Sequence, residues 1–317
     1  MELIPAHTNF PFIPNRRFGY IFSTSLSVLC IVVFFVRGGF NYGIDFAGGL
    51  NVHARFTEAV DAKAIRDAVG TAVPGDTVVQ SFGGGVENEY LVRVEEASES
   101  DVADLGLRVT KAIEDRFGKD KVQVLSTESV GPQVGGELRK QGLEAFLFAM
   151  IGTLIYISFR FEVKYGVGAI VATFHDILVT VGAFVLLDKE LTLPIVAAVL
   201  TVVGYSLNDT IVVYDRIREN LQRQGKRKTY EEVLNASINE TLSRTILTSG
   251  TTLLVVVALF FLGGAVIHDF AFVLMVGIAI GTYSSIFVAS PCLILWEDYV
   301  GKRMKSKPKP KTAEKAA

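Results

Sequence analysis

Six apolar runs, each about as long as a bilayer is thick, constrain the fold of this chain more than any other feature. They cover residues 18–36, 142–159, 167–187, 193–214, 246–264 and 270–295. A helix needs about 20 apolar residues to cross the hydrocarbon core of a membrane. The mean hydropathy of the 317 residues is +0.39 although 20% of them are charged, so charged and apolar segments are segregated. The sequence therefore predicts an α-helical integral membrane protein with six transmembrane helices.

The distribution of basic residues predicts how these helices are oriented. Arg16 and Arg17 precede the first run, which lacks the short apolar core and A-x-A-like site of a cleavable signal peptide. Lys and Arg are also concentrated in the segments 160–164, 215–244 and 297–317. Because cytoplasmic loops are enriched in these residues, we expect a cytoplasmic N-terminus at 1–17 and a basic, disordered cytoplasmic tail at 297–317.

The connection 215–244 mixes basic and acidic residues. Its pattern predicts a continuation of the fourth helix followed by an amphipathic helix near the membrane surface. A docking site for a partner is the alternative interpretation of the same basic face.

A water-exposed insert at 41–140 separates the first helix from the other five, which occupy 142–296. Alternating apolar residues at 50–56, 77–82, 90–94 and 122–130 predict strands. The runs 59–69 and 100–117 have helical spacing, and Gly83–Gly85 supplies a turn. The order β-α-β-β-α-β predicts a ferredoxin-like α+β domain, and its place in the chain puts it on the periplasmic side.

Two charges inside the apolar runs are the first candidates for function. Asp209, beside Asn208, lies within the fourth run, and Arg244 precedes the fifth. A charged side chain at membrane depth costs at least about 2.5 kcal/mol, so it has a partner or a role. If Asp209 and Arg244 lie at one depth, they form a buried pair. Protonation of Asp209 would then make or break the pair, whereas the alternative is a static salt bridge that fixes helix packing.

Further polar residues could extend such a proton site. Thr248, Thr251 and Thr252 follow Arg244 on one helical face, and that face would line a hydrated path unless the hydroxyls only bond their own backbone. His175 and Asp176 lie near the middle of the third run. They either continue the relay, for which histidine is suited near neutral pH, or make a packed polar contact.

Other functional classes find no support in the sequence. The net charge of −2 gives no basic field for nucleic acid. Cys30 and Cys292 lie far apart in apolar runs, which favours packed small side chains over a disulfide or metal site. No phosphate-binding loop, metal cluster or nucleophile with its base is visible, so no enzyme activity and no cofactor are expected. Gly277 and Gly281 predict close helix packing within the bundle.

The chain resembles the SecF family, the smaller membrane subunits of the bacterial SecDF accessory complex, which belongs with the resistance-nodulation-division transporters. The resemblance extends from residue 16 to about 296 and rests on five motifs: Tyr42–Gly49, Val130–Gln133, Phe174–Asp176, Asn208–Asp209 and Ser243–Thr245. It implies a bacterial inner-membrane protein in which Asp209 and Arg244 take part in proton conduction. It also implies that Asp45, Gly48 and Gly49 form a hinge or brace at the base of the periplasmic domain.

The same resemblance implies partners and an activity. The partners are SecD, the SecYEG translocon with SecA, preprotein clients and membrane lipids, and the set extends to YidC and YajC. The activity is export of preproteins on the periplasmic side, driven by the proton motive force. Two alternatives stay open: a scaffold that transports nothing, and an exporter of small molecules or lipids. A single insert of about 100 residues is smaller than the porter region that such an exporter needs.

Overall fold

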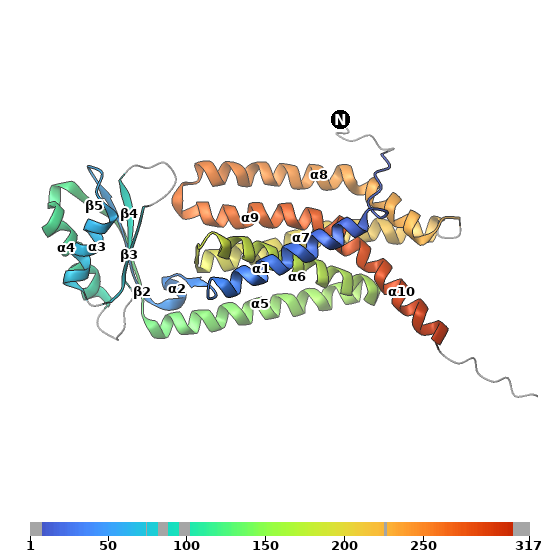
Figure 1. Cartoon of the computed structure of the whole chain (residues 1–317), viewed down its shortest axis with the longest axis horizontal. Helices are drawn as coiled ribbons and strands as arrows, with labels where there is room; N and C mark the ends of the chain where they lie inside the picture. Colours follow the sequence, from blue (N-terminus) through green and yellow to red (C-terminus); the bar gives the residue numbers. More distant parts are fainter. Residues whose placement is uncertain (1–7, 74, 82–87, 95–101, 225–226, 307–317) are drawn as a thin grey trace, which may run out of the picture.

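The chain forms a long helical bundle with a small α/β domain at one end (Figure 1). The computed structural model describes residues 8–73, 75–81, 88–94, 102–224 and 227–306. The bundle occupies most of the length of the molecule, and the α/β domain projects from the end opposite to the turn between Gln224 and Tyr230. This arrangement separates the apolar and the water-exposed parts of the sequence.

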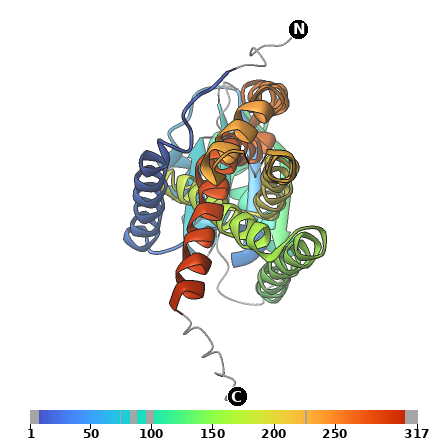
Figure 2. The same ribbon diagram turned by 90° about the vertical axis from the view of Figure 1, so that its right-hand side faces the viewer.

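Six helical segments are long and apolar enough to cross a membrane, as predicted. They are α1 (Arg16–Val36), α5 (Pro132–Arg160), α6 (Val163–Leu186), α7 (Leu193–Gln224), α8 (Tyr230–Leu262) and a last span built from α9 (Gly264–Ser284), a π-helical segment η2 (Ser285–Ala289) and α10 (Ser290–Ser306). The apolar windows of α6, α7 and the last span are 61%, 50% and 44% buried, against 17%, 6% and 17% for α1, α5 and α8. The first three therefore form the centre of the bundle, and the other three lie around it (Figure 2).

Small residues bring the central helices together. A Cβ on Gly277 of α9 would collide with the side chain of Val202 of α7, and one on Gly281 would lie 3.1 Å from Cβ of Ser206. The predicted packing role of these two glycines is confirmed, since only hydrogen at these positions allows the two backbones to approach so closely.

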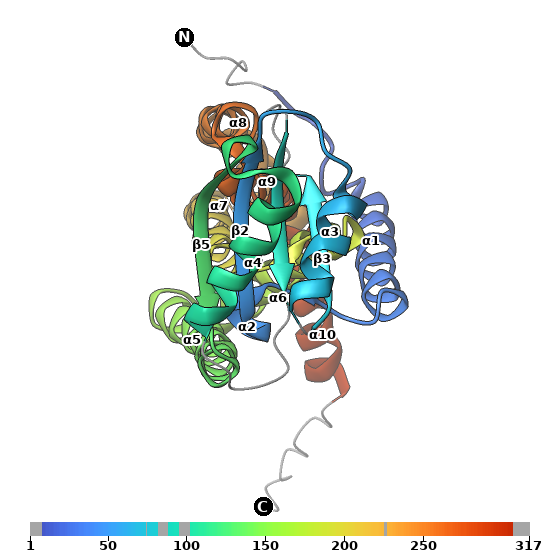
Figure 3. The same ribbon diagram turned by 90° about the vertical axis from the view of Figure 1, so that its left-hand side faces the viewer.

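The insert has the predicted order of elements. It runs β2 (Gly49–Phe56), α3 (Ala62–Ala72), β3 (Thr77–Ser81), β4 (Glu89–Val94), α4 (Val102–Phe117), a 3₁₀ turn η1 (Lys119–Lys121) and β5 (Val122–Val130). The strands form one antiparallel sheet in the order β3-β4-β2-β5, which is the ferredoxin-like topology. Alternate residues of β2 pack with α3 and α4 in a separate core. The two helices cover the outer face of the sheet (Figure 3), so its other face is turned towards the bundle. The predicted turn Gly83–Gly85 lies outside the described residues.

Two short elements join the insert to the bundle. β1 (Asn41–Tyr42) follows α1 and pairs in parallel with β6 (Glu190–Leu191), which precedes α7. The single helical turn α2 (Ile44–Ala47) then leads into β2. The insert is therefore tied to the connection between α6 and α7 as well as to its own chain neighbours.

The connection 215–244 differs from its prediction. The fourth helix does continue to Gln224, but no separate amphipathic surface helix follows, because α8 runs unbroken from Tyr230 into the membrane-spanning part. Buried Asn220 of α7 donates to Ser237 Oγ (3.0 Å) and to Glu240 Oε2 (2.7 Å) of α8. Residues that look amphipathic in sequence thus form a helical hairpin. A capping box between Thr229 and Glu232 fixes the start of α8.

The N-terminal segment packs on α8, and the last helix extends further than predicted. Asn239 of α8 accepts from Phe10 N–H (2.7 Å) and Asn235 from Ile13 N–H (3.1 Å), and Ile13 is fully buried. At the other end α10 continues the last span to Ser306, so residues 297–306 are helical and the prediction of a disordered tail from 297 is wrong for them. Residues 1–7 and 307–317 lie outside the described part.

Candidate functional site: a buried carboxylate network

Asp176 lies at the centre of the bundle and has three hydrogen-bond partners. It is fully buried on α6, where its Oδ1 lies 2.9 Å from His175 Nδ1. Its Oδ2 accepts from Ser206 Oγ of α7 (2.5 Å) and from Ser284 Oγ of α9 (2.6 Å). Such donors allow a carboxylate to keep its charge without water. His175 Nε2 is also buried, and within the described residues it has no hydrogen-bond partner.

Asp209 has a similar environment one helix further along the chain. It is 5% exposed on α7. Its Oδ1 accepts from Thr245 Oγ1 of α8 (2.8 Å), and its Oδ2 accepts from Ser285 Oγ of the last span (2.8 Å). Asp209 therefore contacts two other spans through hydroxyl groups, and both of its oxygens are used.

Consecutive serines connect the two carboxylates. Ser284 bonds Asp176, and Ser285 bonds Asp209. They lie where α9 changes into the π-helical segment η2, and Ser290 Oγ donates to the Ser285 carbonyl across that segment (2.9 Å). A π-helical turn within an α-helix is rare and is frequently found at a functional site. Adjacent residues on a regular helix face directions about 100° apart, which suits two acids on different neighbouring helices.

The predicted pair of Asp209 with Arg244 is not present. Arg244 is exposed, and in the part of the chain that the structure describes it makes no ion pair. Thr245, the next residue, contacts Asp209 instead. Because neighbouring helical residues point about 100° apart, α8 can direct only one of the two at α7. The buried salt bridge, which was conditional on the two charges lying at one depth, is not formed among the described residues, and Thr245 makes the contact of α8 with Asp209 instead.

The threonine stripe and Asn208 also lie away from the network. Thr248 and Thr251 are exposed and donate to the backbone carbonyls of Arg244 and Leu247 (2.9 and 2.8 Å). Thr252 bonds the Thr248 carbonyl (2.9 Å) and Tyr205 Oη (3.4 Å). Asn208 is exposed on α7. The three threonine hydroxyls donate to backbone carbonyls of their own helix, which is the alternative interpretation of the stripe.

Three hydroxyl residues of the network, Ser206, Ser284 and Ser285, were not singled out from the sequence, and Thr245 was named only as part of the motif Ser243–Thr245. One signal was available, because Ser284-Ser285 is a pair of polar residues within a long apolar run. Serine also occurs in membrane helices as a small packing residue, so the pair alone does not identify a site.

The second predicted group, Asp45, Gly48 and Gly49, forms a tight joint. Asp45 Oδ2 accepts from Leu193 N–H (2.8 Å), so α2 supplies the carboxylate that caps the first turn of α7. Gly48 and Gly49 have φ of +79° and +121°. A Cβ on Gly48 would lie 2.9 Å from the Cα of Pro132, the first residue of α5. Such packing leaves little room for rotation and favours a brace over a hinge.

A buried ion pair strengthens this joint. Arg93 of β4, 5% exposed, pairs with Glu190 of β6 (3.3 Å) and donates to the Tyr42 carbonyl of β1 (2.6 Å). Gln80 of β3 also donates to Glu190 (3.3 Å). The sheet of the insert is therefore bonded directly to the segment that leads into α7.

A further buried charge holds the insert together. Glu89 of β4 is 4% exposed and accepts from Arg55 Nε (2.6 Å), and its carboxylate lies 2.9 Å from His53 Nε2. Burial raises the pKa of Glu89, but the hydrogen bonds from Arg55 and His53 outweigh it, so the pKa lies below its usual value. The carboxylate thus stays charged and joins β2 to β4.

The network has the components of a proton site without a metal. Among the described residues no three His, Cys, Asp or Glu side chains lie close enough together to hold a metal ion. Cys30 and Cys292 are both free thiols, as predicted, and Cys30 is buried against Gly182 of α6. The carboxylates can take up and release protons, and hydroxyl groups can both donate and accept hydrogen bonds between them.

Fold and site together define a class: a multi-pass membrane protein with titratable groups inside its bundle and a ferredoxin-like insert. Residues 109–299 match the family described as protein export membrane protein SecD/SecF, C-terminal. The chain belongs to this family, on its SecF branch. The protein translocase subunit SecF of Magnetococcus marinus is 48% identical over 299 residues, which are 94% of this chain and 95% of the relative. That of Vibrio alginolyticus is 43% identical and covers 91% and 90%.

Solved structures agree with this assignment. The chain resembles the crystal structure of SecDF, a translocon-associated membrane protein from Thermus thermophilus, with a TM-score of 0.82 and 38% identity over 93% of this chain. A second SecDF structure, in a super-membrane-facing form, gives a TM-score of 0.70 and 37% identity over 97% of this chain. The chain spans 40% and 41% of the lengths of these two proteins.

Proposed function

We propose that this chain is a subunit of a protein translocase that works with SecD and uses the proton motive force to promote preprotein export. The observation that carries the proposal is the link between the two buried acids, Asp176 and Asp209, through Ser284 and Ser285. Intramembrane acids are expensive and commonly mark proton pathways. SecYEG with SecA, YidC, YajC and membrane lipids are the further partners that the family suggests.

The mechanism starts with uptake of a proton by Asp209. Neutralising this carboxylate weakens its bonds with Thr245 and Ser285, because hydrogen bonds to a charged acceptor are about twice as strong as neutral ones. The three helices that meet at Asp209 then shift relative to one another. Loss of the proton on the other side of the membrane restores the first arrangement. The π-helical segment η2 is the element that can change register, since it lies between both acids.

The movement reaches the insert through the start of α7. Asp45 caps this helix, and Glu190, three residues before it, holds Arg93 of the insert sheet. Because Asp45, Gly48 and Gly49 form a tight joint, the insert moves as one body with the N-terminal end of α7. The TM-scores of this chain with the two SecDF structures differ, at 0.82 and 0.70, and one of these structures is described as a super-membrane-facing form. This difference supports the proposal that proteins of the family adopt more than one arrangement.

Arg244, Thr248 and Asn208 take part, in this proposal, at the surface towards SecD. They are exposed on the neighbouring helices α7 and α8, and the apolar window of α8 is only 17% buried. A partner that covers this surface would enclose the guanidinium of Arg244 and provide its counter-charge. We further propose that both termini are cytoplasmic and that the insert is periplasmic. The ends of α5 and α7, at Arg160 and Gln224, lie at the end of the bundle opposite to the insert, and the chain there is rich in Arg and Lys.

The test uses inverted inner-membrane vesicles that contain this chain and SecD. Completion of preprotein translocation is followed with the proton gradient present and collapsed, for the native chain and for Asp209→Asn. We expect the variant to lose the gradient-dependent part and to keep the ATP-driven part. Asp215→Asn is the matched control, because Asp215 is 49% exposed on the same helix and pairs with Arg160 at 3.8 Å. Full gradient dependence in Asp209→Asn would instead support a scaffold.

A further inference from the structure

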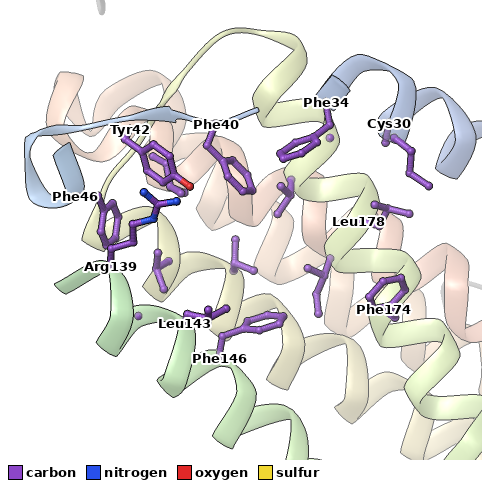
Figure 4. A pocket seen from close by; sticks show the side chains of 18 of the residues that line it. Cys30, Phe34, Phe40, Tyr42, Phe46, Arg139, Leu143, Phe146, Phe174 and Leu178 are labelled. Atoms are coloured by element: carbon purple, nitrogen blue, oxygen red, sulfur yellow. The ribbon is translucent and has the colours of Figure 1, made fainter. Parts of the chain in front are cut away.

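An apolar groove runs along the bundle between α1 and α5, with α6 as its floor (Figure 4). Its volume is about 570 Å³, within the range of about 300–1,000 Å³ that is common for sites that bind small molecules. Aromatic and aliphatic side chains from these three helices and from α7 face into it, among them Phe34, Phe146, Phe174 and Leu178. The buried carboxylates do not line it, so it is separate from the proton site.

The groove ends at the membrane surface next to the insert. Tyr42 and Phe46 of the joint line that end, and Gly142, where the apolar run of α5 begins, lies beside them. Aromatic residues are typical of the level of the lipid headgroups. In the other direction the groove reaches Phe174, in the middle of α6. It therefore extends from the headgroup level into the hydrocarbon core.

Arg139 is the charged side chain at the surface end of the groove. Its guanidinium lies over the ring of Tyr42, 4.4 Å from the centroid, and reaches from α5 towards β1 (Figure 4). In the described part of the chain no carboxylate pairs with it. A cation with no counter-ion, at headgroup depth and above an apolar groove, fits an amphiphile with an anionic head.

We propose that the groove binds an anionic phospholipid of the outer leaflet, with an acyl chain along α6 and the phosphate at Arg139. An acyl chain needs no hydrogen-bond partners and can follow a narrow apolar groove. The lipid would contact Phe46 on α2, next to Asp45, which caps α7.

The test measures lipid contact directly, and its result does not depend on proton coupling. The full chain with SecD is reconstituted in nanodiscs, with Trp296→Phe to remove the single native tryptophan and Phe146→Trp as a reporter in the groove. Brominated phosphatidylglycerol or brominated phosphatidylcholine is included at the same series of increasing mole fractions. The quenching of the tryptophan fluorescence is measured at each step. We expect phosphatidylglycerol to quench at about fivefold lower concentration, the preference expected for one cation at an anionic headgroup.

Two further variants separate a specific site from general lipid contact. Arg139→Gln should remove the preference for phosphatidylglycerol. Lys140→Gln should keep it, because Lys140 is the next residue on α5, is 69% exposed and does not line the groove. Equal quenching by both lipids in the native background would overturn the proposal. So would absence of quenching by either lipid, which would mean that protein occupies the groove.

Discussion

At the scale of single residues, the site depends on hydroxyl groups. They donate hydrogen bonds to two carboxylates that are buried away from water. Asp176 and Asp209 accept four hydrogen bonds from Ser and Thr side chains on other helices. Asp209 could be recognised from the sequence because a carboxylate in an apolar run is costly. Its partner could not, since the choice between Arg244 and Thr245 depends on the rotation of α8 about its own axis, which packing determines.

Thr245→Val tests the support of Asp209 with little change in shape. The variant leaves one carboxylate oxygen without a donor, and we expect a loss of about 1–2 kcal/mol in unfolding free energy. The measurement is thermal or denaturant unfolding of the purified chain in detergent. Thr248→Val on the same helix is the control and should change stability little, because Thr248 is exposed and bonds only backbone. Equal losses in both variants would argue against a special role of Thr245.

Gly48→Ala tests the brace. The backbone of Gly48, with φ +79° and ψ +170°, lies in a region that only glycine readily occupies. Together with the approach of Pro132, this predicts a loss of about 1–3 kcal/mol in stability. Gly136→Ala, in the helical part of α5 with open space around it, should be neutral or slightly stabilising. A fully stable Gly48→Ala would mean that the joint relaxes easily, as a hinge does.

At the scale of elements, the sequence predicts what periodicity determines and misses what long-range packing determines. The six spans and the β-α-β-β-α-β order follow from apolar spacing that is local in the chain. The pairing of β1 with β6 joins residues about 150 positions apart through two-residue strands, which carry no periodic signal. For the same reason the contact of Arg93 with Glu190, on which the link between insert and bundle depends, was not predicted.

Arg93→Gln should uncouple the insert from the proton site. It removes the charge that pairs with Glu190 but leaves Asp209 and Asp176 unchanged. We expect proton flux through the reconstituted complex to persist while gradient-dependent translocation falls. Arg55→Gln is the control, because Arg55 pairs with Glu89 inside the insert. If Arg93→Gln retained full gradient-dependent translocation, force would have to reach the insert by another route.

At the scale of the whole molecule, an apolar helical bundle and a water-exposed α/β insert are joined at a closely packed joint. The bundle holds titratable groups at its centre, and the insert presents a small folded domain outside it (Figure 1). The bundle leaves α1, α5 and α8 mostly uncovered, as expected for a subunit that meets lipid on some faces and a partner on others. Coupling between the two parts then needs no flexible linker, only a shift of α7.

The most direct test of this account is proton flux through liposomes that contain the chain and SecD, with a pH-sensitive dye inside. The native complex, Asp176→Asn, Asp209→Asn and the double variant are compared after an imposed gradient, with Asp215→Asn as control. If the acids act as one unit, each single variant should lose as much flux as the double variant, and the control should lose none. Native flux in Asp209→Asn, with the complex assembled, would contradict the account and leave the buried acids a structural role.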